Sequence, residues 1–114
     1  MEIKKWQETV DQWIKQHGVR YFDEMTNTLI LTEEVGEIAL LISRKYGEQS
    51  WKKKEDEQNA DTLIKDEIVD ILFVLTCLAN QMDIDLTSAL QQNIDKKTKR
   101  DNRRHHDNEK LLDS

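Results

Sequence analysis

Hydrophobic residues in the first part of the chain recur at steps of three and four, the spacing of one face of an α-helix. The recurring positions of the first segment are Ile3, Trp6, Val10, Trp13, Ile14 and His17. Gly18 follows as a residue at which helices commonly end. The pattern resumes after Asp23, whose side chain suits a helix N-cap. It continues to Tyr46, and Gly47 marks the next stop. We therefore expect two helices, one ending near Gly18 and one running from Asp23 to Tyr46.

The second half of the chain predicts two further helices separated from the first pair by a charged loop. Residues 47–61, "GEQSWKKKEDEQNAD", lose the apolar period and are dense in charge, so we expect a loop there. A third helix is predicted from Thr62 to Met82. The sequence "DID" at 83–85 then supplies caps for a fourth helix, whose narrower apolar stripe consists of Leu86, Ala89, Leu90 and Ile94.

These elements predict an all-α protein built as a four-helix-bundle-like single domain over residues 1–104, with a polar, frayed C-terminal tail at 105–114. The chain of 114 residues has no proline and only three glycines, so few residues interrupt its helices. The apolar stripes look broader than four helices can cover, and hydrophobic residues make up only 37% of the chain. We therefore expect a homo-oligomer, either a homodimer or a homotetramer.

Charge and cysteine content narrow the class of protein. The formal net charge is −6, but residues 96–104 carry +5, which leaves −11 for the rest. Such acidity argues against general nucleic-acid binding. The lone Cys77 excludes an internal disulfide and fits a reducing compartment. The longest nearly apolar run, Ile71–Ala79, is too short to span a membrane, and the first residues hold no apolar signal core. We expect a cytoplasmic protein without a membrane partner.

Two pairs of carboxylates interrupt the most apolar stripes of the chain. Helical spacing places Glu34 and Glu37 on one face of the second helix, between Ile30 and Leu41. On the third helix the same spacing aligns an acidic pair with aliphatic residues, namely Leu63, Glu67, Asp70, Val74 and Leu78. A fully solvated acidic face would not be bordered by large aliphatic side chains in this way.

Burying ionised carboxylates together is unfavourable by several kcal/mol unless protons, basic partners or a cation compensate. Neither stripe offers an obvious basic residue. Carboxylate oxygens alone suit a hard divalent cation, Mg²⁺ or Mn²⁺. Either pair taken singly is also common as plain surface decoration. A di-iron centre needs Glu-x-x-His pairs, and the three histidines, His17, His105 and His106, do not have that spacing.

The two acidic motifs, "EEVGE" at 33–37 and "EIVD" at 67–70, resemble the signature of the MazG-like nucleoside triphosphate pyrophosphohydrolases. The similarity continues through "DILFVLTCLANQMDIDLTSAL" and covers roughly Asp23 to Arg104. It implies an all-α bundle assembled as a dimer or a dimer of dimers. It also implies Mg²⁺-dependent hydrolysis of nucleoside triphosphates, often non-standard or deoxy ones, to a monophosphate and pyrophosphate.

The resemblance further implies which residues form the site. The metal ligands would be Glu34, Glu37, Glu67 and Asp70. Glu33, the first acid of the motif, would bind a second metal or orient water. The basic end of the fourth helix would meet the phosphates, and Lys96 and Arg100 share one of its faces. The same two residues also suit a plain positive helix C-terminus.

The base-binding side is less defined. Trp51 in the charged loop, or Trp6 and Trp13 from the first helix, could stack on a base, and Asn80 could read its edge. The structural alternatives are loop anchoring for Trp51, core packing for Trp6 and Trp13, and a helix-end hydrogen bond for Asn80. The alternative to an enzyme is a non-catalytic helical module that binds nucleotide or another protein.

Overall fold

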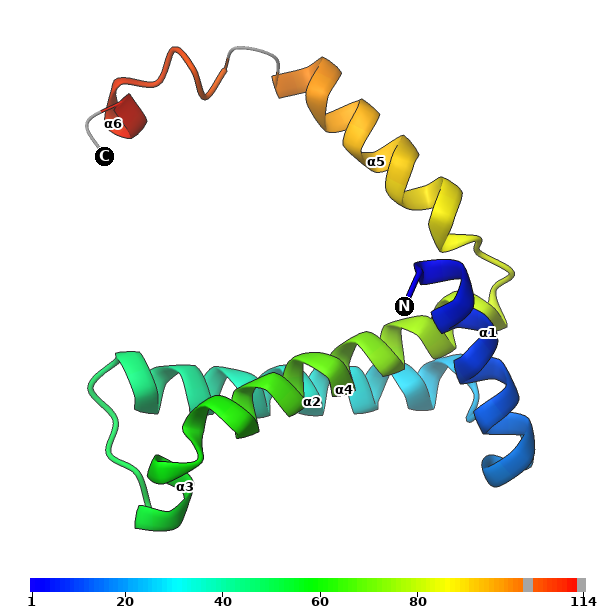
Figure 1. The fold of residues 1–114 in the computed structure, drawn as a ribbon, viewed down its shortest axis with the longest axis horizontal. Helices are drawn as coiled ribbons and strands as arrows, with labels where there is room; N and C mark the ends of the chain where they lie inside the picture. The colour runs from blue at the N-terminus through cyan, green and yellow to red at the C-terminus, as the bar shows by residue number, and fades with distance from the viewer. Residues whose placement is uncertain (102–103, 113–114) are drawn as a thin grey trace.

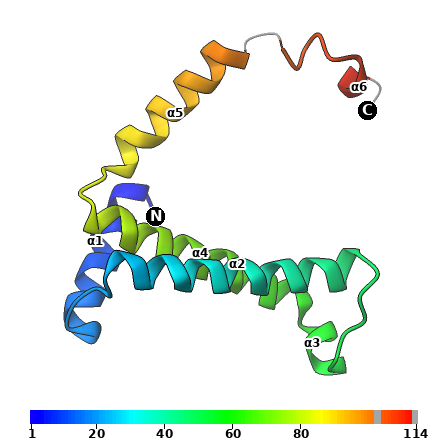
Figure 2. The same ribbon diagram turned by 180° about the vertical axis from the view of Figure 1, so that it is seen from behind.

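The computed structural model describes residues 1–101 and 104–112, and within that part of the chain every regular element is a helix (Figure 1). Two long helices, α2 (Glu24–Tyr46) and α4 (Ala60–Gln81), lie side by side in opposite directions (Figures 1 and 2). Their bounds lie within two residues of those predicted. The all-α class predicted from the apolar period is confirmed.

Local interactions fix both ends of α2. Asp23 accepts a hydrogen bond from the Thr26 backbone N–H at 2.7 Å, which satisfies a free donor of the first turn. Arg44 and Lys45 stand in the last turn, where the helix dipole favours positive charge. At Gly47 a β-carbon would lie 2.6 Å from the Ser43 carbonyl oxygen, so only glycine fits this close approach. The predicted cap and stop of this helix are both confirmed.

The first predicted helix is also present, but its last turn is wider than an α-helix. Helix α1 (Ile3–Trp13) continues directly into η1 (Ile14–Gly18), a π-helical turn. The next residue, Val19, has a φ of 68°. Left-handed backbone is unfavourable for a β-branched side chain, so the chain is strained where it leaves η1. The apolar period of the sequence gave no signal for this wider turn.

Helix α1 packs against α4 through both polar and apolar contacts. The Trp6 indole N–H donates to Thr76 Oγ1 at 2.7 Å, and the Trp6 ring meets Phe73 edge-on. Val10 beside it is only 1% exposed. The buried hydrophobic core of the described residues is small and consists of Val10, Ala60, Val74, Cys77 and Ala79.

Two predictions of irregular structure are corrected. The expected loop at 47–61 contains a short helix, α3 (Lys54–Gln58), which packs against α4. The first turn of α3 is rich in acidic residues, which are favourable at a helix N-terminus. The sequence shows no apolar period that would predict this helix. The expected frayed tail contains a four-residue helix, α6 (Glu109–Leu112). Residues 113 and 114 of that tail lie outside the described residues.

The fourth main helix, α5 (Leu86–Asp101), stands apart from the α2–α4 pair. It contacts α1 near its start and then projects away, as Figures 1 and 2 show. Leu90 and Ile94 on its stripe are more than half exposed. The radius of gyration is 18.1 Å, whereas a compact domain of this length has about 13 Å. No helix among the described residues is long and apolar enough to cross a membrane.

Candidate active site

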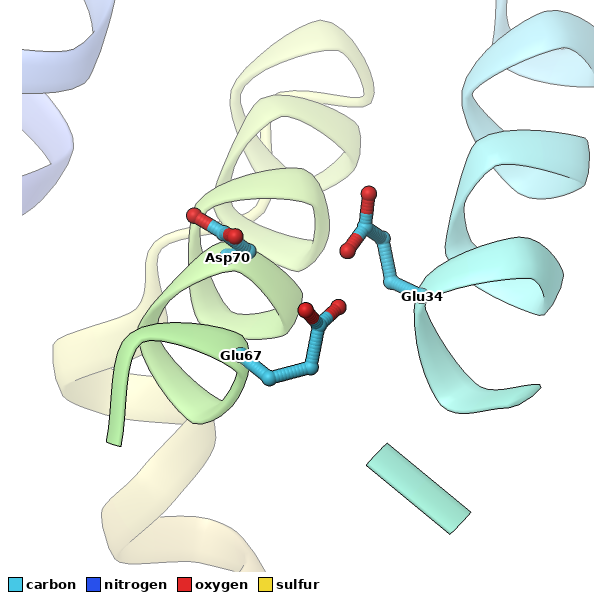
Figure 3. Close-up of side chains that lie close together, drawn as sticks. All are labelled: Glu34, Glu67 and Asp70. Atoms are coloured by element: carbon cyan, nitrogen blue, oxygen red, sulfur yellow. The ribbon is translucent and has the colours of Figure 1, made fainter. Parts of the chain in front are cut away.

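The antiparallel pairing of α2 and α4 brings three carboxylates together (Figure 3). Glu34 comes from α2, and Glu67 and Asp70 lie one turn apart on α4. One carboxylate oxygen from each residue lies within 4.8 Å of the other two. Figure 3 shows Glu34 and Glu67 extending toward each other across the space between the helices. The two acidic motifs, about thirty residues apart in the sequence, therefore contribute to one cluster.

Burial makes Glu67 the most constrained of the three. Its residue is 8% exposed, and its Oε1 is buried without a hydrogen-bond partner among the described residues. A buried polar atom without a partner is uncommon in native structures and suggests an unfilled role. Glu34 is half-buried, and Asp70 is exposed at the edge of the cluster.

The proximity of the carboxylates changes their acidity. The pKa of Glu67 is raised to about 8, mainly by a hydrogen bond with the Glu34 carboxyl and by burial. Repulsion from Glu34, Glu37 and Asp70 adds to this shift. The pKa of Asp70 is also raised, first by partial desolvation of its carboxylate against the neighbouring helix and then by repulsion from Glu34 and Asp66. Without a cation the cluster therefore favours a bound proton at neutral pH.

A cavity of about 390 Å³ adjoins the cluster on the side of α3. Glu37 lines it together with Glu67 and Asp70, although the oxygens of Glu37 lie outside the close group of three. Asp66 lines the same cavity, so its charge reaches the site from the next position on α4. Three of the four expected ligands thus meet closely, and the fourth faces the same space.

Arg44 is a candidate site residue that the sequence interpretation missed. It lines this cavity, and its Nε is buried with no hydrogen-bond partner among the described residues. The expectation that neither stripe offers a basic residue is therefore wrong. Arg44 follows Glu37 by seven residues, which places both on one face two turns apart, so helical spacing could have identified it.

The remaining charged candidates lie outside the cluster. Glu33 is exposed on α2 and does not join the close carboxylate group. Lys96 and Arg100 are exposed on α5, and Arg100 pairs with Asp101 at 2.7 Å. Because α5 projects away from α2 and α4 (Figures 1 and 2), one chain does not bring these basic residues to its own carboxylates.

The base-side candidates fall in three different places. Trp51 lines a separate cavity of about 260 Å³ beside Lys45 and Asp61. Trp6 is held in the α1–α4 contact by its bond to Thr76, which matches the core-packing alternative. Trp13 is 51% exposed and packs edge-on against Phe73, so it is not a core residue.

Asn80 makes the structural hydrogen bonds that were its alternative interpretation. Its amide nitrogen donates to the Gln7 carbonyl oxygen at 3.0 Å and to the Tyr21 hydroxyl at 3.1 Å. Its Oδ1 accepts from Gln7 Nε2 at 2.9 Å. With its donors and its acceptor engaged, Asn80 ties α1 to the end of α4 instead of facing the carboxylates.

Comparison with known proteins relates this chain to a protein family. The sequence model of the MazG nucleotide pyrophosphohydrolase domain matches residues 22–105, which include all three clustered carboxylates. The chain belongs to this family. As a MazG protein it is an enzyme, a hydrolase of the nucleotide pyrophosphatase type. The predicted resemblance is thereby confirmed, and the alternative of a non-catalytic interaction module is disfavoured.

Relatives agree with the family model in both sequence and fold. The uncharacterized protein YpjD of Bacillus subtilis (strain 168) is 41% identical over 87 residues, 76% of this chain and 75% of YpjD. Its crystal structure matches with a TM-score of 0.70 and 36% identity, covering 84% of this chain and 94% of that one. A Bacillus-conserved MazG protein, a nucleotide pyrophosphohydrolase, matches with a TM-score of 0.69 and 33% identity, over 84% and 88% of the two chains.

Proposed function

We propose that this MazG protein hydrolyses nucleoside triphosphates, non-standard or deoxy ones in particular, to a nucleoside monophosphate and pyrophosphate in a Mg²⁺-dependent reaction. Mn²⁺ would substitute for Mg²⁺. The enzyme would act in the cytoplasm as a housekeeper of the nucleotide pool. The observation that carries this proposal is Glu67: a buried carboxylate with an unpartnered oxygen, facing Glu34 and beside Asp70.

The residues present fit a divalent cation. The donor set is oxygen only, as Mg²⁺ and Mn²⁺ prefer, and three oxygens converge within 4.8 Å. The raised pKa values of Glu67 and Asp70 express a repulsion that a cation would relieve. Glu34, Glu67 and Asp70 would hold the ion, with Glu37 contributing from the adjoining cavity. When bound, such an ion polarises phosphate oxygens and lowers the pKa of water.

The chain's own residues bind and orient the triphosphate. Arg44 faces the cavity beside Glu37, and its unpartnered Nε suits a phosphate oxygen. Its positive charge opposes the repulsion between the anionic substrate and the carboxylates. Glu33 stays a candidate for orienting water from the exposed rim, at a lower rank than the clustered acids.

The proposal includes a homo-oligomer, a homodimer or homotetramer, that completes the site. Large aliphatic residues of α4 near the carboxylates are exposed, namely Ile68, Leu72 and Leu75, and so are Leu90 and Ile94 of α5. The basic end of α5 complements the acidic remainder of the chain. Helix α5 of one copy would cover the α2–α4 pair of another. Lys96 and Arg100 would then contact the pyrophosphate leaving group at the partner's carboxylates.

Pyrophosphate release from a panel of ribo- and deoxynucleoside triphosphates, with and without Mg²⁺, tests the proposal. The wild-type protein should release pyrophosphate only with the divalent ion. Glu67→Gln should lower kcat at least about 1,000-fold with unchanged helix content, since one ligand and one charge are lost. Glu48→Gln, an exposed acid in the loop after α2, is the matched control and should retain full activity. Full turnover by Glu67→Gln would remove this cluster from consideration.

A further inference from the structure

The direction of α5 is set by a short segment at its base. Every residue from Leu90 to Arg100 is exposed, whereas Leu86 and Ala89 in the first turn are half-buried, and α5 contacts α1. Arg100 lies fourteen residues beyond Leu86, or about 21 Å along the helix axis. A tilt of about 10° at the base therefore moves the Arg100 end by roughly 4 Å, more than the length of a hydrogen bond. The basic end of α5 is thus placed by the turn that precedes the helix.

The turn between α4 and α5 has a defined backbone conformation. The Ile84 N–H donates to the Ala79 carbonyl oxygen at 2.8 Å, and the Asp83 N–H donates to the Asn80 carbonyl oxygen at 3.3 Å. Asp83 has a φ of 55°, in the left-handed region. These two bonds and the left-handed residue between them form a Schellman motif, which closes a helix. The motif joins the turn to α4, and a separate contact is needed to join it to α1.

The side chain of Gln7 on α1 supplies that contact. Its amide nitrogen donates to the Ile84 carbonyl oxygen at 2.9 Å, and its Oε1 accepts from the Leu86 backbone N–H at 2.9 Å. The carbonyl of Ile84 can only accept and the N–H of Leu86 can only donate, so the amide has one orientation. Leu86 is the first residue of α5. Gln7 therefore holds the chain on both sides of the point at which α5 begins.

Gln7 is itself held in place from α4. Its amide nitrogen also donates to Asn80 Oδ1 at 2.9 Å, and the Asn80 amide nitrogen donates to the Gln7 carbonyl oxygen at 3.0 Å. An amide nitrogen carries two hydrogens, and both of those on Gln7 have acceptors. A glutamate at this position would lack the two donors, and an aliphatic residue would lack the acceptor as well. The contact therefore requires an amide.

We propose that Gln7 is a positioning residue for the reaction: it sets the direction of α5 and thereby places Lys96 and Arg100 at the pyrophosphate end of the substrate. Gln7 belongs neither to the carboxylate cluster nor to the lining of the adjoining cavity, so it acts through α5. This inference rests on the proposed function, in which the basic end of α5 serves the carboxylates of a partner copy. It adds the residue that determines where that basic end lies.

Distances between spin labels on α4 and α5 test the positioning directly. Labels at the exposed positions Lys65→Cys and Lys99→Cys, in a Cys77→Ala background, report the angle between the two helices by pulsed electron paramagnetic resonance. The labelled protein is first mixed with an excess of unlabelled protein, so that each oligomer holds one labelled copy. With Gln7 present we expect one narrow distance distribution. Gln7→Met should shift its mean or widen it by at least about 4 Å.

Equilibrium binding tests whether the direction of α5 matters to the site. The probes are pyrophosphate and a nucleoside monophosphate, both with Mg²⁺ present. Gln7→Met should weaken pyrophosphate binding at least about tenfold, as should the double variant Lys96→Met, Arg100→Met, because each removes charge-assisted hydrogen bonds to the same group. Binding of the monophosphate should stay within about twofold of wild type. In the background of the double variant, Gln7→Met should cause no further loss, because no basic end remains to be placed.

Thr76→Val is the matched control, because it removes the Trp6 hydrogen bond between α1 and α4 and leaves the turn before α5 unchanged. It should keep the wild-type distance and pyrophosphate binding. If Gln7→Met fails to fold, Gln7→Glu, which keeps the acceptor for Leu86, takes its place. A folded Gln7 variant with the wild-type distance or wild-type pyrophosphate binding overturns the inference and leaves the proposed function intact. Wild type that cleaves no nucleotide overturns the proposed function, and the distance then still decides whether Gln7 sets the direction of α5.

Discussion

Glu67 is the residue at which folding and the proposed function oppose each other. Aliphatic neighbours bury the Glu67 side chain, and the facing Glu34 carboxyl together with this burial raises the pKa of Glu67 to about 8. A chain selected for stability alone would place a neutral or apolar side chain here. In the sequence, this conflict is visible as an acidic residue within an apolar stripe. It could not show which oxygen stays unpartnered, because that depends on how α2 and α4 approach each other.

The metal-free protein should therefore lose stability as pH rises. The Glu67 carboxyl binds its proton more tightly in the folded state, where its pKa is about 8, than in the unfolded state, near 4.5. Its favourable contribution is complete below about pH 4.5 and is lost as pH rises through 8. With EDTA present, Glu67→Gln should flatten this dependence and raise the free energy of unfolding at pH 8 by about 1–3 kcal/mol. Denaturant titrations from pH 5 to 8.5 measure both, and parallel curves for the two proteins would contradict the account.

Arg44 offers a second prediction at this scale. Arg44→Met keeps the aliphatic stem but removes the guanidinium from a cavity that Glu37 and Asp66 also line. Losing charge-assisted hydrogen bonds of about 1.5–3 kcal/mol should raise KM for triphosphates about ten- to a hundredfold. Lys65→Met, an exposed lysine on α4, should change KM less than twofold. Equal effects of both substitutions would mean that only the overall charge matters.

At the scale of elements, the long helices were predictable and the short ones were not. Apolar residues recur at helical spacing in α2 and α4 because one face of each helix packs against the other. The sequence alone therefore predicts the bounds of both helices to within two residues. Helix α3 carries no apolar stripe, and its packing on α4 is a tertiary contact. The π-turn η1 differs from an α-helix by one extra residue in a turn, which the spacing of side chains does not encode.

A further prediction concerns Val19, the residue at which the chain leaves η1. Val19 is 87% exposed, so it gains little from packing, yet its φ of 68° is unfavourable for a β-branched residue. Val19→Gly should raise the free energy of unfolding by about 1 kcal/mol by relieving this strain. Val19→Ile keeps the branching and should leave stability unchanged. Thermal denaturation of the metal-free variants provides the comparison, and a less stable Val19→Gly protein would show that this backbone is relaxed.

At the scale of the whole molecule, the sequence predicted the carboxylate cluster better than the placement of the basic residues. Glu34, Glu67 and Asp70 meet because two adjacent antiparallel helices carry them at matching heights. Lys96 and Arg100 lie on α5, whose direction depends on the turn after α4 and its contact with α1. No local pattern encodes that direction. The exposed aliphatic faces and the large radius of gyration support the proposal that a second copy covers these helices.

Mixing two variants that are each expected to be inactive tests whether the basic end of α5 acts across the proposed oligomer. Glu67→Gln damages the carboxylate cluster of its own copy, and the double variant Lys96→Met, Arg100→Met damages only the basic end. In a mixed dimer one of the two equivalent sites would combine intact carboxylates with an intact basic end. Random reassociation should then restore about a quarter of wild-type activity. Each variant should be inactive by itself, and both should show the oligomeric mass of wild type by light scattering. If the two groups instead act within one chain, each mixed dimer holds no complete site, and mixing restores nothing.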